Sequence, residues 1–343
     1  MQSSLPLYTI YNDPVFSGFI AEYFDWKYRM GLIREGEKEI AQLPFVRVGR
    51  QWVSVPHGSV VGLGKLSDQF SVGELDGLMS LMVEELENNL SKKQKIIIPL
   101  QEIRDALPVM AYKNKKDLCW QVRSFIPFTD NVYRDKVMSL IRPAADPEEQ
   151  FALFSSNLRR KIRKAEKNGI MVKTGRQELA DDFYEVFSKN MHRLGSPFLR
   201  KDFYTRLIKS YPGQKGKIFI AYRGKKPIGA SLLLGYKNFW ENIYFATLDK
   251  FNTLYPSYIL QWNMIQYAIG QNADTYSSGR STFNSGTHQY IKQWGTEDLP
   301  LYWNHSHPQG RNIRKFGFLN KIWKKLPYGF CKATGPGLAR RVF

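Results

Sequence analysis

The hydrophobic pattern of the second half of the chain predicts alternating helices and strands. Apolar residues recur at helical spacing through residues 157–170, 179–194, 201–211 and 256–269. Apolar runs at 218–222, 227–235 and 240–247 have the length and composition of successive strands. The last helix begins at Pro256, a first-turn position where a proline loses no helical hydrogen bond. The pattern therefore predicts an α/β (α+β) domain with a mixed, mostly antiparallel sheet flanked by helices.

The first half of the chain also alternates predicted helices and strands, but less regularly. Residues 14–29 are predicted to form a helix, and two alternating runs around Gly49-Arg50 predict a β-hairpin. A second helix is expected over residues 72–90 and a buried strand over 95–100. Residues 143–147 form a proline-marked break, which predicts domains at residues 1–145 and 146–310.

Composition narrows the class of protein but not its partner. The chain has 343 residues, 43% of them hydrophobic, enough for two folded cores. Its net charge of +19 favours a polyanionic partner, such as nucleic acid, a phosphate-bearing substrate or an anionic membrane. Cys119 and Cys331 lie far apart, so neither a disulfide framework nor a metal site is expected. Because the N-terminus lacks a signal pattern and no apolar run reaches bilayer length, a cytoplasmic protein is expected.

The most basic stretch is the predicted helix at residues 157–170. Leu158, Ile162 and Ala165 give it one apolar stripe, and Gly169 is a plausible stop. The remaining surface is cationic and could hold a phosphate-rich donor or acceptor, although a charge run is also typical of an ordinary solvated face. The candidate anion-binding residues are Arg159, Arg160, Lys161, Arg163 and Lys164.

A set of motifs in the second half resembles a known family. They cover roughly Phe151 to Trp303, in the same order as in that family. The motifs are Leu158-Arg-Arg-Lys-Ile-Arg-Lys-Ala-Glu-Lys-Asn-Gly-Ile, Phe183-Tyr-Glu-Val-Phe, Asn190-Met-His-Arg-Leu-Gly-Ser-Pro, Ala221-Tyr-Arg-Gly-Lys-Lys-Pro-Ile-Gly-Ala, Tyr255-Pro-Ser, Leu260-Gln-Trp, Ser278-Gly-Arg-Ser, Gly286-Thr and Tyr290-Ile-Lys-Gln-Trp-Gly. Together they resemble the Fem-type (FemAB/FemABX-like) aminoacyltransferases that form peptidoglycan bridges, within the GNAT-like acyltransferase superfamily.

This resemblance implies an architecture and a reaction. Two tandem GNAT-like domains are expected, the first a degenerate copy, with the tail at residues 311–343 packing back on it. Better-known members move an amino acid from an aminoacyl-tRNA to an amine of a cell-wall precursor. The chain lacks the long heptad arm of some members, and the glycine-rich pyrophosphate loop of ordinary N-acetyltransferases is absent before Pro256. The donor could thus be an aminoacyl-tRNA or, less readily, an acyl-CoA, and no tightly bound cofactor is expected.

The resemblance also assigns candidate catalytic residues. Lys292 matches a motif lysine implicated in stabilising charge on the reacting carbonyl. Arg280, in the polar, glycine-containing loop expected at the end of a predicted strand, could bind a carboxylate or phosphate through two hydrogen bonds, although a structural ion pair is the alternative.

Further candidates surround these two. Tyr290 and Trp294 could shape a pocket or belong to the core, and Ser281 is a neighbouring substrate contact. His288, Tyr244 and Glu241 are candidates for proton handling, with a structural role as the alternative for each, whereas His192 is expected in packing or at the surface. Free N–H groups at the predicted helix start near Ser257 and Tyr258 could bind phosphate.

The C-terminal segment leaves the partner open. Residues 311–343 carry nine basic and no acidic residues among apolar ones. Such a segment could lie on an anionic membrane, face nucleic acid or simply pack.

The sequence predicts an acyl or aminoacyl transferase that acts on an amine, or a hydroxyl, of a peptidoglycan, lipid or polysaccharide precursor. The alternative is a non-catalytic basic module that binds RNA or anionic lipid.

Overall fold

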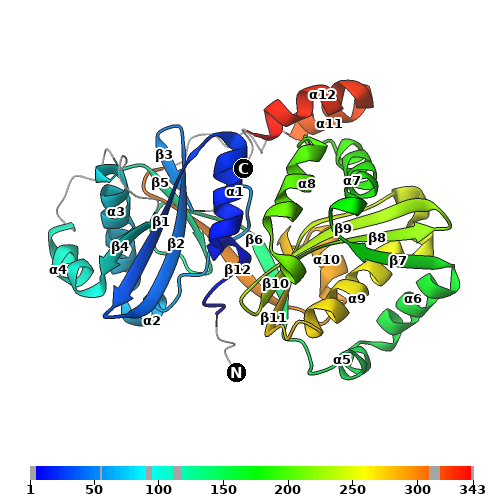
Figure 1. Cartoon of the computed structure of the whole chain (residues 1–343), viewed down its shortest axis with the longest axis horizontal. Helices are drawn as coiled ribbons and strands as arrows, with labels where there is room; N and C mark the ends of the chain where they lie inside the picture. Colours follow the sequence, from blue (N-terminus) through cyan, green and yellow to red (C-terminus); the bar gives the residue numbers. More distant parts are fainter. Residues whose placement is uncertain (1–4, 55, 90–94, 111–117, 309–316, 341–343) are drawn as a thin grey trace. The chain divides into compact units, whose positions relative to one another are not determined.

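The computed structural model describes residues 5–54, 56–89, 95–110, 118–308 and 317–340 (Figure 1). Contacts between Cα atoms divide the chain into two units. Unit 1 comprises Met1–Met138 with Leu299–Arg311, and unit 2 comprises Ser139–Asp298 with Asn312–Phe343. The chain therefore passes between the units three times, and the boundary predicted at 145/146 falls inside unit 2.

Unit 1 contains a mixed sheet in the strand order β4-β1-β2-β3-β5-β12. Strands β1 and β2 are antiparallel, whereas β4 joins β1 and β5 joins β3 in parallel. The segment Leu299–His305 returns from unit 2 as most of β12 and pairs antiparallel with β5. The elements are η1 (Ile10–Asn12), α1 (Pro14–Phe24), β1 (Lys27–Glu35), β2 (Lys38–Val48), β3 (Gln51–Val53), α2 (Leu66–Gln69), α3 (Val72–Asn88), β4 (Lys95–Pro99), α4 (Leu100–Met110), β5 (Trp120–Ser124), β6 (Val132–Ile141) and β12 (Glu297–His305).

Two expectations for unit 1 need correction. The helix predicted over residues 14–29 ends at Phe24, because Asp25 takes a left-handed conformation with φ 54° and the chain then enters β1. The strand at Lys95 is not buried on both faces. Ile96 and Ile98 are buried while Ile97 is 54% exposed, as expected of a strand at the edge of the sheet.

Unit 2 has a central sheet with helices on both faces (Figure 1). Its strand order is β6-β11-β10-β9-β8-β7, and all pairs from β10 to β7 are antiparallel. Helices α7 and α8 cover one face, and α6 and α9 cover the other. The elements are α5 (Pro147–Leu153), α6 (Ser156–Lys167), β7 (Ile170–Gly175), η3 (Gln177–Leu179), α7 (Ala180–Leu194), α8 (Lys201–Ser210), η4 (Gly213–Lys215), β8 (Gly216–Arg223), β9 (Lys226–Tyr236), β10 (Phe239–Thr247), η5 (Asp249–Leu254), α9 (Pro256–Ile269), β11 (Thr275–Thr282) and α10 (Gly286–Lys292).

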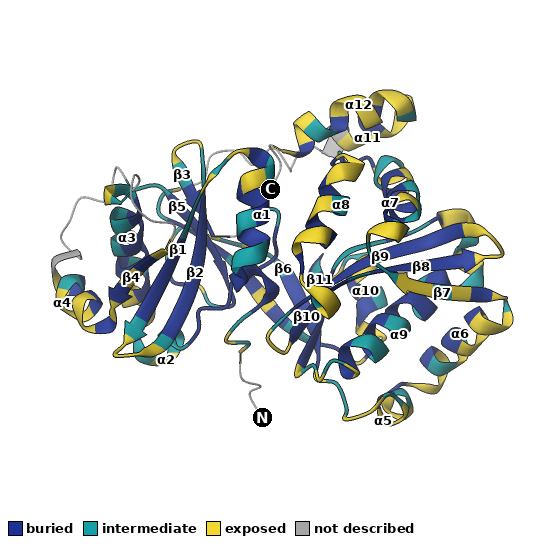
Figure 2. Cartoon of the chain, in the orientation of Figure 1, coloured by how far each residue is buried: buried dark blue, intermediate teal, exposed yellow. Residues whose placement is uncertain are grey.

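The basic helix predicted from the sequence is α6. Its stripe of Leu158, Ile162 and Ala165 is buried in the core cluster that also contains α9, whereas most of its cationic positions are exposed (Figure 2). Gly169 follows the helix with φ +73°, a conformation that glycine adopts readily. The predicted stripe and stop are both confirmed.

The C-terminal helices α11 (Gly317–Lys325) and α12 (Tyr328–Ala339) belong to unit 2 and pack on α7 (Figure 1). The Ser188 and Tyr328 hydroxyls lie 2.8 Å apart, and His192 Nε2 lies 2.9 Å from the Leu326 carbonyl oxygen. The expectation that this tail packs on the first domain is therefore wrong for its described residues. The buried side of α12, which consists of Cys331, Gly335 and Ala339, packs within unit 2.

Unit 1 should lose stability in mild acid because of His305. Burial, with the positive charge of Arg123 as a second cause, lowers the pKa of His305 to about 4 from 6.5. Between these values the unfolded chain binds a proton that the folded chain excludes, so stability falls as the pH drops from about 6.5 to 4, by roughly 3 kcal/mol in total. Urea unfolding followed across this range should show the slope. His305→Gln should flatten it and His307→Gln should not; an unchanged slope in His305→Gln would refute this origin.

Candidate active site

The central feature of unit 2 is the point where strands β10 and β11 stop pairing. They are parallel from Phe239 to Glu241 and from Thr275 to Ser277, after which neither strand is paired with the other. The register of β10 against β9 also shifts between Asn242 and Tyr244, a bulge that re-aims the following side chains. Residues 242–247 of β10 therefore keep their pairing with β9 but have lost β11 as a neighbour in the ladder.

A glycine allows the close approach at this point. Gly279 has φ +78°, and a Cβ there would lie 2.9 Å from the Asn242 carbonyl oxygen on β10. Any larger residue would be both strained and crowded. Gln261 of α9 donates to the Ser278 hydroxyl at 2.8 Å, which fixes the same turn of β11 to the helix.

Arg280 and Tyr244 lie on the separated parts of these strands. Burial raises the pKa of the Tyr244 phenol, and the charge of Arg280 opposes that shift without reversing it. Tyr244 therefore stays protonated at neutral pH and can donate a hydrogen bond but cannot act as a base. Its ring packs edge-on against Phe187 and Tyr204. Arg280 is on a strand rather than in the loop that the sequence predicted.

Helix α10 carries Lys292 at its last position. The helix begins after Ser285, whose side chain accepts a hydrogen bond from the His288 N–H and caps it. The Lys292 ammonium lies 3.3 Å from Oδ2 of Asp298, and the lysine side chain keeps 48% of its surface exposed. The cation is consequently held by a carboxylate on one side and open to solvent on the other.

Asp298 collects three donors at the start of β12. Ser139 donates to Oδ1 at 2.7 Å, and His288 Nε2 and Lys292 Nζ both approach Oδ2. Burial acts to raise the pKa of Asp298, but these hydrogen bonds and the charge of Lys292 outweigh it and the pKa is lowered. The carboxylate remains ionised, so it orients Lys292 rather than accepting protons from a substrate.

His288 is buried between two partners. Its Nδ1 accepts from the Asn284 N–H at 3.1 Å, so Nε2 carries the proton that it donates to Asp298 at 2.8 Å. Both ring nitrogens are engaged and the residue is 3% exposed. The structural alternative for His288 is the one that fits this geometry.

A second cluster joins α6, α9 and α10. Lys161 Nζ lies 2.7 Å from Oε1 of Gln293 and 3.0 Å from the Tyr258 hydroxyl, and also sits 4.8 Å from the centre of the Tyr258 ring. Lys164 sits 5.3 Å from the ring centre of Tyr255. These two cations therefore lie beside the start of α9, and a helix N-terminus favours anions.

The other basic residues of α6 point elsewhere. Arg159 donates to the Ala152 carbonyl at 2.7 Å, and Arg160 donates to the Asn157 side chain at 2.9 Å. Arg163 lies over the Phe151 ring at 5.3 Å. Of the five anion-binding candidates on this helix, only Lys161 and Lys164 are brought to the start of α9.

The remaining predicted residues mainly hold this region together. Tyr290 donates from its hydroxyl to the Ser257 carbonyl at 3.0 Å, which ties α10 to the first turn of α9. Trp294 is 1% exposed and lies edge-on to Phe154 within the core. Ser281 is 5% exposed, and its hydroxyl finds no hydrogen-bond partner in the part of the chain that the structure describes.

Three residues of this site were missed from the sequence. Asp298 and Ser139 lie far apart along the chain and meet only because β12 and β6 bring them together at unit 2. Gln293, directly after Lys292, carries no chemical signal of its own. The sequence signal that could have indicated Asp298 is its position six residues after the motif lysine Lys292.

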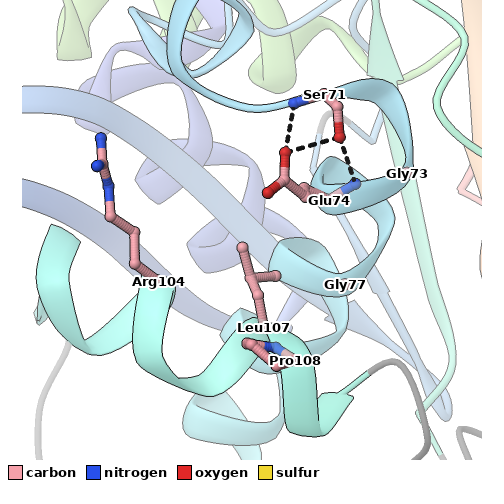
Figure 3. Close-up of a pocket in the computed structure, with 7 residues that line it drawn as sticks. All are labelled: Ser71, Gly73, Glu74, Gly77, Arg104, Leu107 and Pro108. Atoms are coloured by element: carbon pink, nitrogen blue, oxygen red, sulfur yellow. Dashed lines mark hydrogen bonds between the residues drawn. The ribbon is translucent and has the colours of Figure 1, made fainter.

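A cavity of about 440 Å³ lies on unit 1 between α3 and α4 (Figure 3). Its upper wall is the cap of α3, in which Ser71 and Glu74 exchange hydrogen bonds. None of the predicted site residues lines it. The lining residues are Ser71, Gly73, Glu74, Gly77, Arg104, Leu107 and Pro108.

One family model matches a segment of unit 2. Residues 153–290 match the acetyltransferase (GNAT) domain family. The UDP-N-acetylmuramoylpentapeptide-lysine N(6)-alanyltransferase of Weissella viridescens is 24% identical over 184 residues, which are 50% of this chain and 54% of that protein. The chain thus aligns with about half the length of this curated relative.

One solved structure extends the likeness in fold to both units. The crystal structure of FemX has a TM-score of 0.58 and 12% identity, and the match covers 84% of this chain and 90% of that one. L-PGS from Bacillus licheniformis has a TM-score of 0.49 and 10% identity over 94% of this chain and 100% of that one. The expected GNAT-like fold class is confirmed.

Lys161 and Arg160 provide a matched test of the anion-binding cluster. Each is a cation on α6, but only Lys161 reaches Tyr258 and Gln293. Lys161→Ala should weaken tRNA binding about tenfold, since charge-assisted contacts contribute on the order of 1.5 kcal/mol, whereas Arg160→Ala should change it by less than about threefold. Titrations at one fixed salt concentration measure both. Equal losses would mean that α6 contributes only diffuse charge.

Proposed function

We propose that this chain, a Fem-type member of the GNAT acyltransferases, transfers an aminoacyl group to an amine of a cell-envelope precursor. The observation that carries the proposal is Lys292, a half-exposed ammonium at the end of α10 that is held by the partly buried carboxylate of Asp298. The matched GNAT domain ends two residues before it. The named activity of the Weissella relative, alanyl transfer to a lysine side chain of a muramoylpentapeptide, supports an amine of a peptidoglycan precursor as the acceptor.

The reaction needs charge stabilisation more than a strong base. A neutral amine attacks the ester carbonyl, a C–N bond forms, and negative charge develops on the carbonyl oxygen before the C–O bond to the donor breaks. The exposed side of Lys292 can neutralise that charge, while Asp298 holds the ammonium in place. The amine proton then passes to the leaving hydroxyl, so proton balance is kept within the reacting groups.

Lys161, Lys164 and the start of α9 are proposed to hold the phosphate groups of the donor. The residue before Pro256 is Tyr255, which has φ 65° and packs edge-on against Tyr258. Bulky aromatic side chains thus occupy the place where ordinary N-acetyltransferases carry a glycine-rich pyrophosphate loop. This arrangement favours an aminoacyl-tRNA over an acyl-CoA as donor. A base at the end of the tRNA could stack on such rings.

Lys292→Ala tests the reaction directly. Turnover of charged tRNA with an amine-bearing muramoylpentapeptide should fall about 100- to 1000-fold in kcat, the usual effect of removing one group that stabilises an oxyanion, with little change in KM. Lys209→Ala, at an exposed position of α8, should leave both constants unchanged. Acyl-CoA serves as the second donor in the same assay. Absence of turnover by the wild type with any donor, together with retained tRNA or liposome binding, would favour a non-catalytic basic module.

Asp298→Asn tests whether the carboxylate positions Lys292. We expect kcat to fall about tenfold, because the ammonium loses its charged partner but not its place on α10. The double variant with Lys292→Ala should be no slower than Lys292→Ala alone, since a positioning residue acts only through the lysine. Asp274→Asn is the control. Additive losses in the double variant would give Asp298 an independent role.

A further inference from the structure

We infer that helices α11 and α12 form a docking surface for an anionic lipid membrane. One face of the two helices packs on the rest of unit 2, and the other face is exposed to solvent. The inward face is formed by Trp323, Cys331, Gly335 and Ala339, all of which are buried. Tyr328 stacks on Phe198 at 6.3 Å, and the Gly195 backbone of α7 lies directly against Asn320. This contact fixes which sides of the helices remain available.

Large apolar side chains remain on the open side. Ile322 is 51% exposed, Phe330 is 52% exposed and Leu338 is 44% exposed. Phe330 and Leu338 are eight residues apart on α12, so they lie along one stripe of that helix. Leu194, at the end of α7 next to α11, is a further exposed apolar residue at 42%. Four exposed apolar side chains on three adjoining helices form a surface that water does not stabilise.

The charge of the same segment selects the partner. Lys321, Lys324 and Lys325 are exposed on α11, and residues 311–343 contain no acidic residue. A surface that pairs exposed Ile, Leu and Phe with lysines matches the boundary between anionic headgroups and acyl chains. A nucleic acid would meet the lysines but would gain nothing from the aliphatic groups. The membrane is therefore the better fit.

Insertion would be shallow. None of the helices in the described residues is both long and apolar enough to cross a bilayer. Trp323 faces inward, so contact would be made through Ile322, Phe330 and Leu338 with the lysines at headgroup level. This inference does not depend on the transfer reaction, because binding can be measured without donor or acceptor.

The experiment uses the full chain with sedimented vesicles. Vesicles of phosphatidylcholine with phosphatidylglycerol should bind the wild type, binding should weaken with salt, and vesicles of phosphatidylcholine alone should bind poorly. The variant with Lys321, Lys324 and Lys325 all changed to Gln should bind roughly 100-fold more weakly, about fivefold for each charge. The control changes Lys209, Lys225 and Lys250 to Gln, which alters net charge equally, and should stay within about threefold of the wild type.

A second pair of variants tests the apolar contribution. Changing Ile322, Phe330 and Leu338 to Ser should weaken binding by about tenfold or more, because their apolar area no longer leaves water. The control changes Val72, Leu153 and Met171 to Ser; these residues are at least as exposed but lie on α3, α5 and β7. Thermal melts establish that each variant is folded. Equal binding of both Ser variants, or binding that ignores the anionic lipid, overturns the inference.

A titration of the Gln variants with tRNA distinguishes RNA from the membrane as the partner of this surface. If the α11 variant loses tRNA binding but no variant changes vesicle binding, the surface serves RNA and the membrane assignment fails. Turnover with soluble donor and acceptor should be unchanged in the Ser variant. A loss of vesicle binding with full turnover therefore tests the docking surface alone, whereas absent turnover with normal vesicle binding would count only against the proposed function.

Discussion

The carboxylate of Asp298 is the interaction on which the candidate site depends. It receives hydrogen bonds from β6 through Ser139 and from α10 through His288, and it holds the Lys292 ammonium. Removing water from a carboxylate is unfavourable unless its oxygens are bonded, and here three donors meet that requirement. The same bonds that keep Asp298 ionised therefore fix the end of α10 and the position of the cation.

A second constraint on unit 2 is that the pairing of β10 and β11 ends part of the way along both strands. A continuous ladder would close the two strands, but the bulge in β10 and the left-handed Gly279 in β11 end their pairing after Glu241 and Ser277. Tyr244 and Arg280 then stand on strands that are held only on their outer sides. Because the phenol stays protonated and the guanidinium stays charged, these two side chains are a hydrogen-bond donor and a cation, and neither is a base.

The sequence predicted unit 2 well because its helices and strands have strong local periodicity. The burial of α6 through Leu158, Ile162 and Ala165, and the start of α9 at Pro256, follow from spacing and proline chemistry alone. Unit 1 was harder. Asp25 ends α1 by adopting a left-handed conformation, and nothing in an apolar run from Phe16 to Phe24 announces that stop. The candidate Lys292 came from a motif that resembles a known family. Its partners Ser139 and Asp298 depend on a tertiary pairing of distant strands, which no local pattern encodes.

The net charge of the chain also shows what a sequence cannot predict, because the same basic residue types have several different physical roles in the structure. Arg123 of unit 1 is fully buried, donates to the Gly58 carbonyl and lies 4.2 Å from the centre of the Trp303 ring, so its charge serves the fold. Lys161 is half-buried against Tyr258 and Gln293, where a cation can meet a phosphate at a helix start. The lysines of α11 are exposed beside Ile322, a setting that suits neither the core nor a small anion.

What distinguishes these cations is the burial and chemistry of their neighbours. A basic net charge of +19 therefore does not distinguish the two groups of cations on unit 2, one at the start of α9 and one on the C-terminal helices.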